Sequence, residues 1–156
     1  MISIDDDVDA NVNAIRGLCH DDLVVGAVHM HKPDFEFANF TLDELQEVSA
    51  SLAGTSELSK AVRDADWGSI KRAKDLAEAY ERITNRGLKG KEWGEALAGL
   101  ARRIPDKPDT NELRQIVKQV SIAERAMHCN YDSEKSEFKI DPVTFQLVPR
   151  SSPPSK

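Results

Sequence analysis

The chain has 156 residues, of which 40% are hydrophobic and 31% charged, a composition typical of one globular domain that can bury a core. No stretch approaches the roughly 18 to 20 apolar residues of a membrane span, and the acidic start lacks the basic residues of a signal peptide, so we expect a cytoplasmic protein. Because only 6% of the residues are aromatic, we expect an aliphatic core, which favours helices over a β-sandwich.

The net charge of −6 conceals an uneven distribution along the chain. Residues 1–57 hold 12 acidic residues against two bases, Arg16 and Lys32, a net of −10, whereas the rest of the chain has 15 acids and 19 bases, a net of +4. An acidic head of this kind attracts a basic partner and steers its approach. The candidate residues for this steering are Asp5, Asp6, Asp7 and Asp9.

The N-terminal part is expected to form a short helix followed by a β-hairpin. Hydrophobic residues at helical spacing indicate the helix over residues 8–18. The β-branched run 23–28 predicts one strand, and the alternation of Phe35 and Phe37 with polar residues predicts a second. A turn signal at residues 32–34 lies between them.

Clear helix signals begin at Thr41. Thr41 and Glu44 form a capping box, in which the threonine hydroxyl accepts from a backbone amide and the glutamate carboxylate accepts from the cap amide. The helix that follows is expected to end at Gly54 in a left-handed conformation. Thr55 or Ser56 then caps a second helical segment.

Two longer amphipathic helices are predicted next. The first begins after a cap at Asp66 or Ser69. The second covers residues 91–104, and its interior contains Gly94 and Gly99, each of which costs about 1 kcal/mol relative to alanine. Since glycine allows a neighbouring backbone to approach closely, we expect tight packing there.

The last helix has the strongest apolar stripe of the sequence, over residues 113–127. Asp109 and Glu112 predict a capping box at its start. The period then changes, and residues 137–148 predict one or two short strands around a turn at Asp141-Pro142.

Together these patterns predict a mainly α protein, a compact helical bundle of about four to five helices with minor β elements. We expect a single globular domain over residues 1–148. It consists of an acidic N-terminal part (1–40), a helical body (41–128) and a short β segment (137–148). Residues 149–156 are expected to form a disordered tail.

The sequence lacks the motifs of the common catalytic classes. It contains no GxxxxGK[ST] loop, no GxGxxG, no GxSxG and no HExxH. The calcium-loop pattern that starts at Asp5 fails, because Ala10 stands where glycine is needed and Arg16 where a bidentate carboxylate is needed. We therefore assign no catalytic residue and no cofactor, and the sequence leans against an enzyme.

Histidines and cysteines nevertheless fall into three short clusters. In an extended strand, His29 and His31 project from the same face, where two imidazoles can share a metal ion. The alternative is that they lie on a polar strand face without a metal. The candidate ligands of a metal-dependent enzyme are Cys19, His20, His29, His31, His128 and Cys129.

Basic residues concentrate on the central helices, in a number that can contact several phosphates. Acidic residues are interleaved with them at ion-pair spacing, as in Glu78 and Arg82, so part of this charge is neutralised locally. The alternative function is a small helical nucleic-acid-binding subunit of a nucleoprotein complex. Its contact residues would be Lys71, Arg72, Lys74, Arg82, Arg86, Lys89, Lys91, Arg102 and Arg103.

The interpretation that we rank first is a non-catalytic interaction protein. It would act as an adaptor, assembly subunit or inhibitor that docks on another protein through its helical surface, with the acidic head as a steering patch. The expected partner is therefore another protein, with nucleic acid as the alternative and no membrane. A homo-oligomer is left open.

Overall fold

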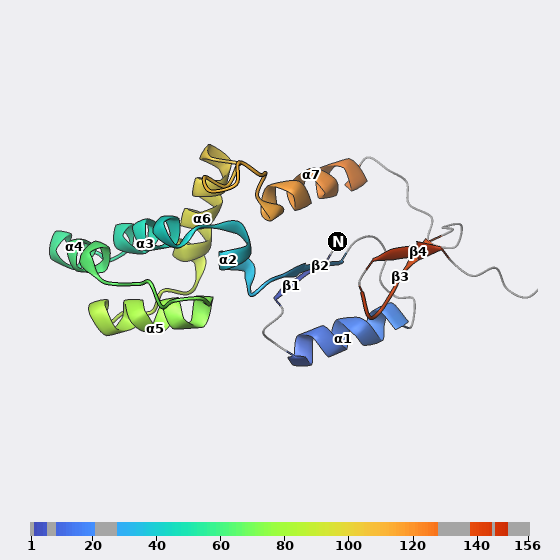
Figure 1. Cartoon of the computed structure of the whole chain (residues 1–156), viewed down its shortest axis with the longest axis horizontal. Helices are drawn as coiled ribbons and strands as arrows, with labels where there is room; N and C mark the ends of the chain where they lie inside the picture. Colours follow the sequence, from blue (N-terminus) through green and yellow to red (C-terminus); the bar gives the residue numbers. More distant parts are fainter. Residues whose placement is uncertain (1, 6–8, 21–27, 128–137, 145, 150–156) are drawn as a thin grey trace, which may run out of the picture. The chain divides into compact units, whose positions relative to one another are not determined.

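A computed structural model of the chain describes residues 2–5, 9–20, 28–127, 138–144 and 146–149. In these residues, seven helices accompany two short two-stranded sheets (Figure 1). The predicted mainly helical class with minor β elements is therefore confirmed. None of the described helices is long and apolar enough to cross a membrane.

The chain divides into two compact units. Residues 1–32 and 122–156 form one, here called the terminal unit, and residues 33–121 form the other, here called the central unit. Each unit contains its own cluster of buried hydrophobic side chains. The single domain expected over residues 1–148 stays a prediction.

The terminal unit begins with strand, helix and strand. Strands β1 (Ile2–Asp5) and β2 (Val28–His31) pair in parallel, and helix α1 (Asp9–His20) lies between them in the sequence. Parallel strands cannot be joined by a tight turn, so this helix serves as the crossover connection. The helix predicted over residues 8–18 is confirmed, and it buries Val12 and Cys19.

The hairpin predicted between residues 23 and 40 is wrong. Strand β2 pairs with β1, and residues Phe35–Asn39 form helix α2 instead of a second strand. Asp34 caps this helix, since its Oδ1 accepts from the Phe37 amide at 3.0 Å. This local cap overrides the alternation of aromatic and polar residues, which is too short to fix a period. Residues 23–27 lie outside the described residues.

The predicted C-terminal strands are confirmed. Strands β3 (Phe138–Ile140) and β4 (Leu147–Pro149) pair in an antiparallel ladder. At the turn between them, Asp141 Oδ1 accepts from the amides of Val143 and Thr144 at 2.9 and 2.7 Å. Such side-chain bonds are what makes aspartate a turn residue. Of the predicted tail, Pro149 is the last residue of β4, and residues 150–156 lie outside the described residues.

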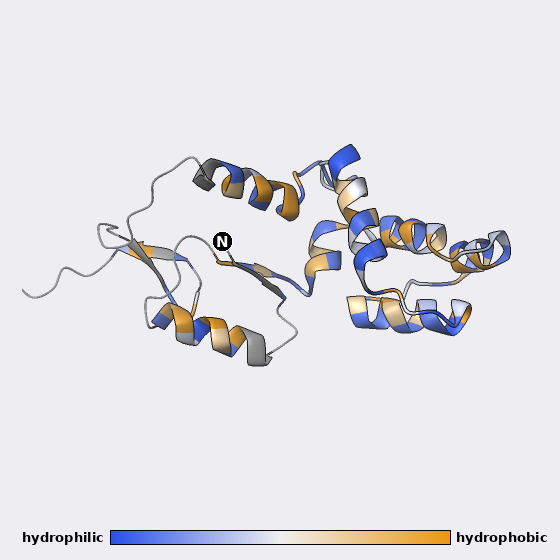
Figure 2. Cartoon of the chain, turned by 180° about the vertical axis from the view of Figure 1, so that it is seen from behind, coloured by the Kyte–Doolittle hydropathy of each residue, from blue (hydrophilic) through white to orange (hydrophobic). Residues whose placement is uncertain are grey.

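The central unit is built from helices. Figure 2 shows hydrophobic and hydrophilic residues alternating along them, as expected of helices that bury one face. Their core includes the fully buried side chains of Leu45 and Val62. The helices are α2, α3 (Leu42–Ser51), α4 (Ser56–Asp64), α5 (Ala73–Thr84), α6 (Lys91–Arg103) and the first part of α7 (Gln115–Met127).

Several caps lie where local sequence predicts them. Thr41 Oγ1 accepts from the Glu44 amide at 3.3 Å and Glu44 Oε2 accepts from the Thr41 amide at 3.0 Å, which completes the capping box of α3. Gly54 has the left-handed φ of +89°. Thr55 caps α4 through a 3.3 Å bond from the Leu58 amide.

Two predicted caps are wrong. Helix α5 begins at Ala73, and the amide of Ala73 donates at 2.8 Å to Oδ2 of Asp34, so neither Asp66 nor Ser69 caps it. Asp66 instead accepts from the amide of Gly68 within its own turn.

The capping box predicted at Asp109 and Glu112 is also wrong, because α7 begins only at Gln115. The segment before it folds back on itself, with an antiparallel bridge between Asp106 and Leu113. The amide of Ile116 donates at 2.7 Å to Asn39 Oδ1, a side chain from α2. A distant residue therefore takes the place of the local cap.

The close packing expected at Gly94 and Gly99 is wrong as well. A Cβ atom built at either glycine meets nothing within 4 Å, because both face open space. We therefore predict that Gly94→Ala raises the free energy of unfolding by about 0.5 to 1 kcal/mol in urea titrations, through better helix propensity.

Gly54→Ala is the matched control and should lower stability. Its φ of +89° disfavours alanine, and the new Cβ would lie 2.5 Å from Arg86 Nη1. A loss of stability in Gly94→Ala would contradict the open surface at that residue.

Candidate protein-docking groove

An apolar groove lies between α6 and α7 in the central unit. It has a volume of about 350 Å³. All of its lining residues belong to the central unit. They are Ala98, Ala101, Arg102, Pro105, Ile116, Val117 and Val120.

The sequence of the two helices explains the groove. On α6, Ala98 and Ala101 are small and leave room beside the helix, which ends before Pro105. The facing wall on α7 has larger β-branched side chains, and Figure 2 shows hydrophobic residues along α7. The predicted apolar stripe of α7 is thus only partly core: Val117 packs against the core, whereas Val120 is 48% exposed.

A fully buried arginine fixes the wall that α7 contributes. Arg114, just before α7, donates from both terminal nitrogens to the Glu44 carboxylate, at 3.0 and 2.5 Å. It also donates to the backbone carbonyls of Asn39 at 2.6 Å and Ile104 at 2.8 Å. Its guanidinium lies 4.9 Å from the ring centroid of Phe40. These contacts connect the start of α7 to α2, α3 and the end of α6.

The partner of this arginine is held as a carboxylate. Burial raises the pKa of Glu44, but the hydrogen bonds from Arg114 and Thr41 and the positive charge of Arg114 outweigh burial and leave the pKa below its ordinary value. Sequence reasoning missed Arg114. The only signal in the sequence was its position, directly after Leu113 within the predicted apolar stripe. A cation at such a position is buried only when its charge is paired.

The rim of the groove is cationic. Arg102 lines it and Arg103 follows, both exposed in the last turn of α6. Neither makes an ion pair with any residue that the structure describes. Ile104, 45% exposed, continues the apolar surface beside them. The described lining residues include no carboxylate, histidine, cysteine or hydroxyl group, so the groove is suited to binding and not to acid–base chemistry.

No protein-family model, curated protein or solved structure matches the chain.

Several bases predicted to contact nucleic acid are held by local interactions. Lys74 pairs with Glu78 at 3.9 Å, and Arg82 Nε donates to the backbone oxygen of Glu78 where an ion pair with its carboxylate was expected. Lys91 pairs with Glu95 at 3.6 Å. These pairs neutralise part of the basic surface of α5 and α6.

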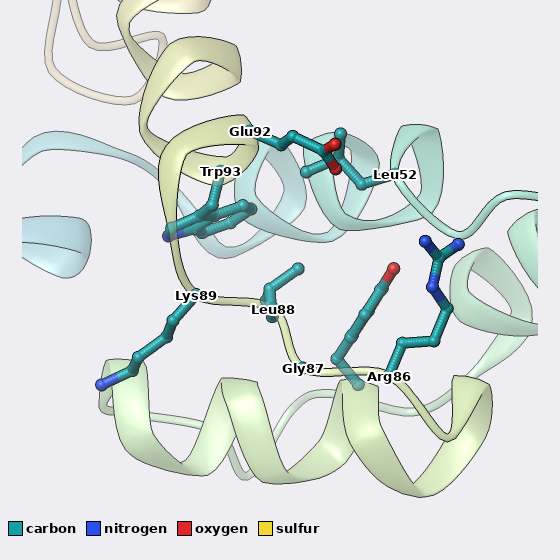
Figure 3. A pocket seen from close by; sticks show the side chains of 8 residues that line it. Leu52, Arg86, Gly87, Leu88, Lys89, Glu92 and Trp93 are labelled. Carbon is teal, nitrogen blue, oxygen red and sulfur yellow. The ribbon is translucent and has the colours of Figure 1, made fainter.

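Two further predicted bases line a small pocket at the start of α6 (Figure 3). In that view, Arg86 extends towards Leu52 on the same side as Glu92, whereas Lys89 points away from them. The two cations therefore do not converge on one phosphate position. Trp93 is buried, and its Nε1 donates to Glu36 Oε1 at 3.1 Å. Its ring is therefore part of the core and is not exposed for stacking on a base.

The predicted metal ligands come together only in part. His29 and His31 both lie on β2, and burial, followed by the charge of His31, lowers the pKa of His29. Burial raises the pKa of the Cys19 thiol, which favours its protonated form. Among the described residues, no three histidine, cysteine or acidic side chains lie close enough to hold a metal. His128 and Cys129 lie outside them, and the metal site stays a prediction.

The acidic head spans both units. Asp5 ends β1 and Asp9 begins α1, while Asp6 and Asp7 lie outside the described residues. Several acids of residues 33–57 are engaged within the central unit: Asp34 and Glu44 as described, and Glu47 in a 2.7 Å pair with Arg63. The net charge of −10 counted over residues 1–57 therefore does not form a single surface of unpaired carboxylates.

Proposed function

We propose that this protein is a non-catalytic interaction protein that binds an amphipathic helix of another protein in the groove between α6 and α7. The groove itself is the observation that carries the proposal. A hydrophobic hollow on a highly charged surface is a common site for a partner helix. Burying Val120 and its neighbours would contribute about 25 cal/mol per Å² of apolar area removed from water.

The rim indicates the charge of the partner. Arg102 lines the groove and Arg103 follows it in the last turn of α6, so acidic side chains of the bound helix would be attracted to this part of α6. The bound face would carry aliphatic residues at the i, i+3 or i+4, and i+7 positions. The partner is therefore an acidic amphipathic helix.

A displayed library of random 16-residue peptides, panned against the whole chain, would test this. We expect enriched peptides with helical apolar spacing and an excess of Asp and Glu. In fluorescence anisotropy, Val120→Asp should weaken the best peptide by about tenfold or more, since it places a charge against the apolar face. Arg102→Glu should weaken acidic peptides and favour their lysine-substituted versions.

Val143→Asp is the matched control, because Val143 is 73% exposed and lies in the terminal unit. It should leave the dissociation constant of the peptide unchanged. The proposal fails if no peptide distinguishes the unmodified chain from Val120→Asp, or if a single-stranded oligonucleotide displaces the peptide. The second result would favour the nucleic-acid alternative.

A further inference from the structure

Helix α6 contributes little side-chain volume to the groove between α6 and α7. Its part of the lining includes Ala98 and Ala101, which lie about one helical turn apart and have no side-chain atom beyond Cβ. The larger neighbouring side chains, Leu97 and Leu100, are buried in the core and do not line the groove. The groove therefore lies where α6 presents only small side chains.

The opposite wall is held in place. Ile116, Val117 and Val120 on α7 are β-branched, and such side chains have few accessible rotamers in a helix. The start of α7 is also tied to the end of α6, because the Arg114 amide donates to the Pro105 carbonyl at 2.9 Å. The groove is therefore preformed, and a side chain that enters it has to match its shape.

The groove is large enough for an aromatic side chain. An apolar cavity of about 150 Å³ can hold a benzene ring. The groove, at about 350 Å³, has room for such a ring together with the methylene group that attaches it to a backbone. A leucine or valine at the same place would make fewer contacts with the two walls, and each lost contact weakens binding.

The polar chemistry of the lining also favours an aromatic ring. Arg102 is the one charged residue among the described residues that line the groove. A guanidinium is attracted to the face of an aromatic ring, as in the contact between Arg114 and Phe40 in this chain. No described lining residue has a carboxylate or hydroxyl oxygen to accept from a buried tyrosine hydroxyl, so phenylalanine fits better than tyrosine.

We propose that the bound helix inserts one phenylalanine side chain between Ala98 and the α7 wall, with Arg102 over the face of the ring. This inference rests on the proposed helix binding and makes Ala98 a residue that determines its specificity. The aliphatic positions of the bound helix flank the ring. The partner class is thereby narrowed to acidic amphipathic helices with a central phenylalanine.

A focused peptide library tests this. Acidic 16-residue helical peptides, with leucine at the outer apolar positions and any residue at the central one, are displayed and panned against the whole chain. We expect phenylalanine to be enriched at the central position. In fluorescence anisotropy, leucine at that position should weaken the enriched peptide about two- to tenfold, and alanine about 30-fold or more.

Ala98→Leu is the variant that fills the groove from α6. It is expected to fold, because Ala98 is exposed and leucine is a good helix former. It should weaken the phenylalanine peptide about tenfold or more and bind the alanine peptide more tightly than the unmodified chain does, since leucine then occupies the space of the ring. Circular dichroism confirms that the variant is folded.

Ala61→Leu is the matched control, because Ala61 is an exposed alanine of α4 and does not line the groove. It should change the affinity of neither peptide. Enrichment of leucine or valine at the central position, or equal weakening of both peptides by Ala98→Leu, would overturn this inference and leave helix binding in place. Peptides that bind Val120→Asp as tightly as the unmodified chain would overturn both proposals.

Discussion

Replacing Arg114 by Met is expected to lower the free energy of unfolding by about 3 to 5 kcal/mol, because the Glu44 carboxylate would lose its buried partner. The guanidinium is fully buried and donates to two carboxylate oxygens and two backbone carbonyls. Methionine fills similar space but donates no hydrogen bond. Urea unfolding at neutral pH measures the difference.

The control is Arg63→Met. Arg63 also makes a two-pronged pair, with Glu47, but the two side chains are 46% and 62% exposed, so we expect a loss of about 0 to 1 kcal/mol. The double change of Arg114→Met with Glu44→Leu should lose less than Arg114→Met alone, because the unpaired carboxylate is gone. Equal losses in Arg114→Met and Arg63→Met would contradict the buried pair.

Acid provides a second measurement of the same interaction. The pKa of Glu44 is lowered in the folded state, so its contribution to stability is present above its unfolded pKa of about 4.3 and is lost as the pH falls through the folded pKa. In Arg114→Met, protonation instead relieves the unpaired buried charge. The difference between the two proteins should therefore shrink as the pH falls from 7 towards 3. A difference that stays constant would assign the loss to packing.

Local signals account for the elements that the sequence predicted. The capping box of Thr41 and Glu44, the left-handed Gly54 and the Thr55 cap each depend on residues no more than three positions apart. Such interactions form in the same way wherever the segment lies in the fold. Helix boundaries set by them could be predicted from the chain alone.

The wrong cap predictions at α5 and α7 involve interactions between distant residues. Asp34 bonds the amide of Ala73, 39 positions away, and Asn39 bonds the amide of Ile116, 77 positions away. Arg114 and Glu44 are 70 positions apart. A search for nearby caps selects Asp66 or Asp109 in their place, since pattern rules weigh only neighbours in sequence.

The candidate groove could be predicted from the sequence only in part. Periodicity predicted an apolar face on α7, but it does not tell which part of that face is covered: Val117 packs against the core, whereas Val120 is 48% exposed.

Asp34 allows the long-range caps to be tested directly. Its Oδ1 accepts from the Phe37 amide at 3.0 Å and its Oδ2 accepts from the Ala73 amide at 2.8 Å, and the residue is 1% exposed. Asp34→Ala leaves both amides without an acceptor, each at a cost of about 1 to 3 kcal/mol. We therefore expect urea titrations to show a loss of about 2 to 4 kcal/mol.

Asp66→Ala is the matched control, since Asp66 accepts from one exposed amide and should lose about 1 kcal/mol or less. Asp34→Asn keeps one side-chain oxygen and should fall between the two. If Asp34→Ala loses no more than Asp66→Ala, the amides of α2 and α5 have other partners. Because Asp34 lies outside the groove lining, its folded variants should bind the selected peptides unchanged, which separates the stability of the central unit from helix binding.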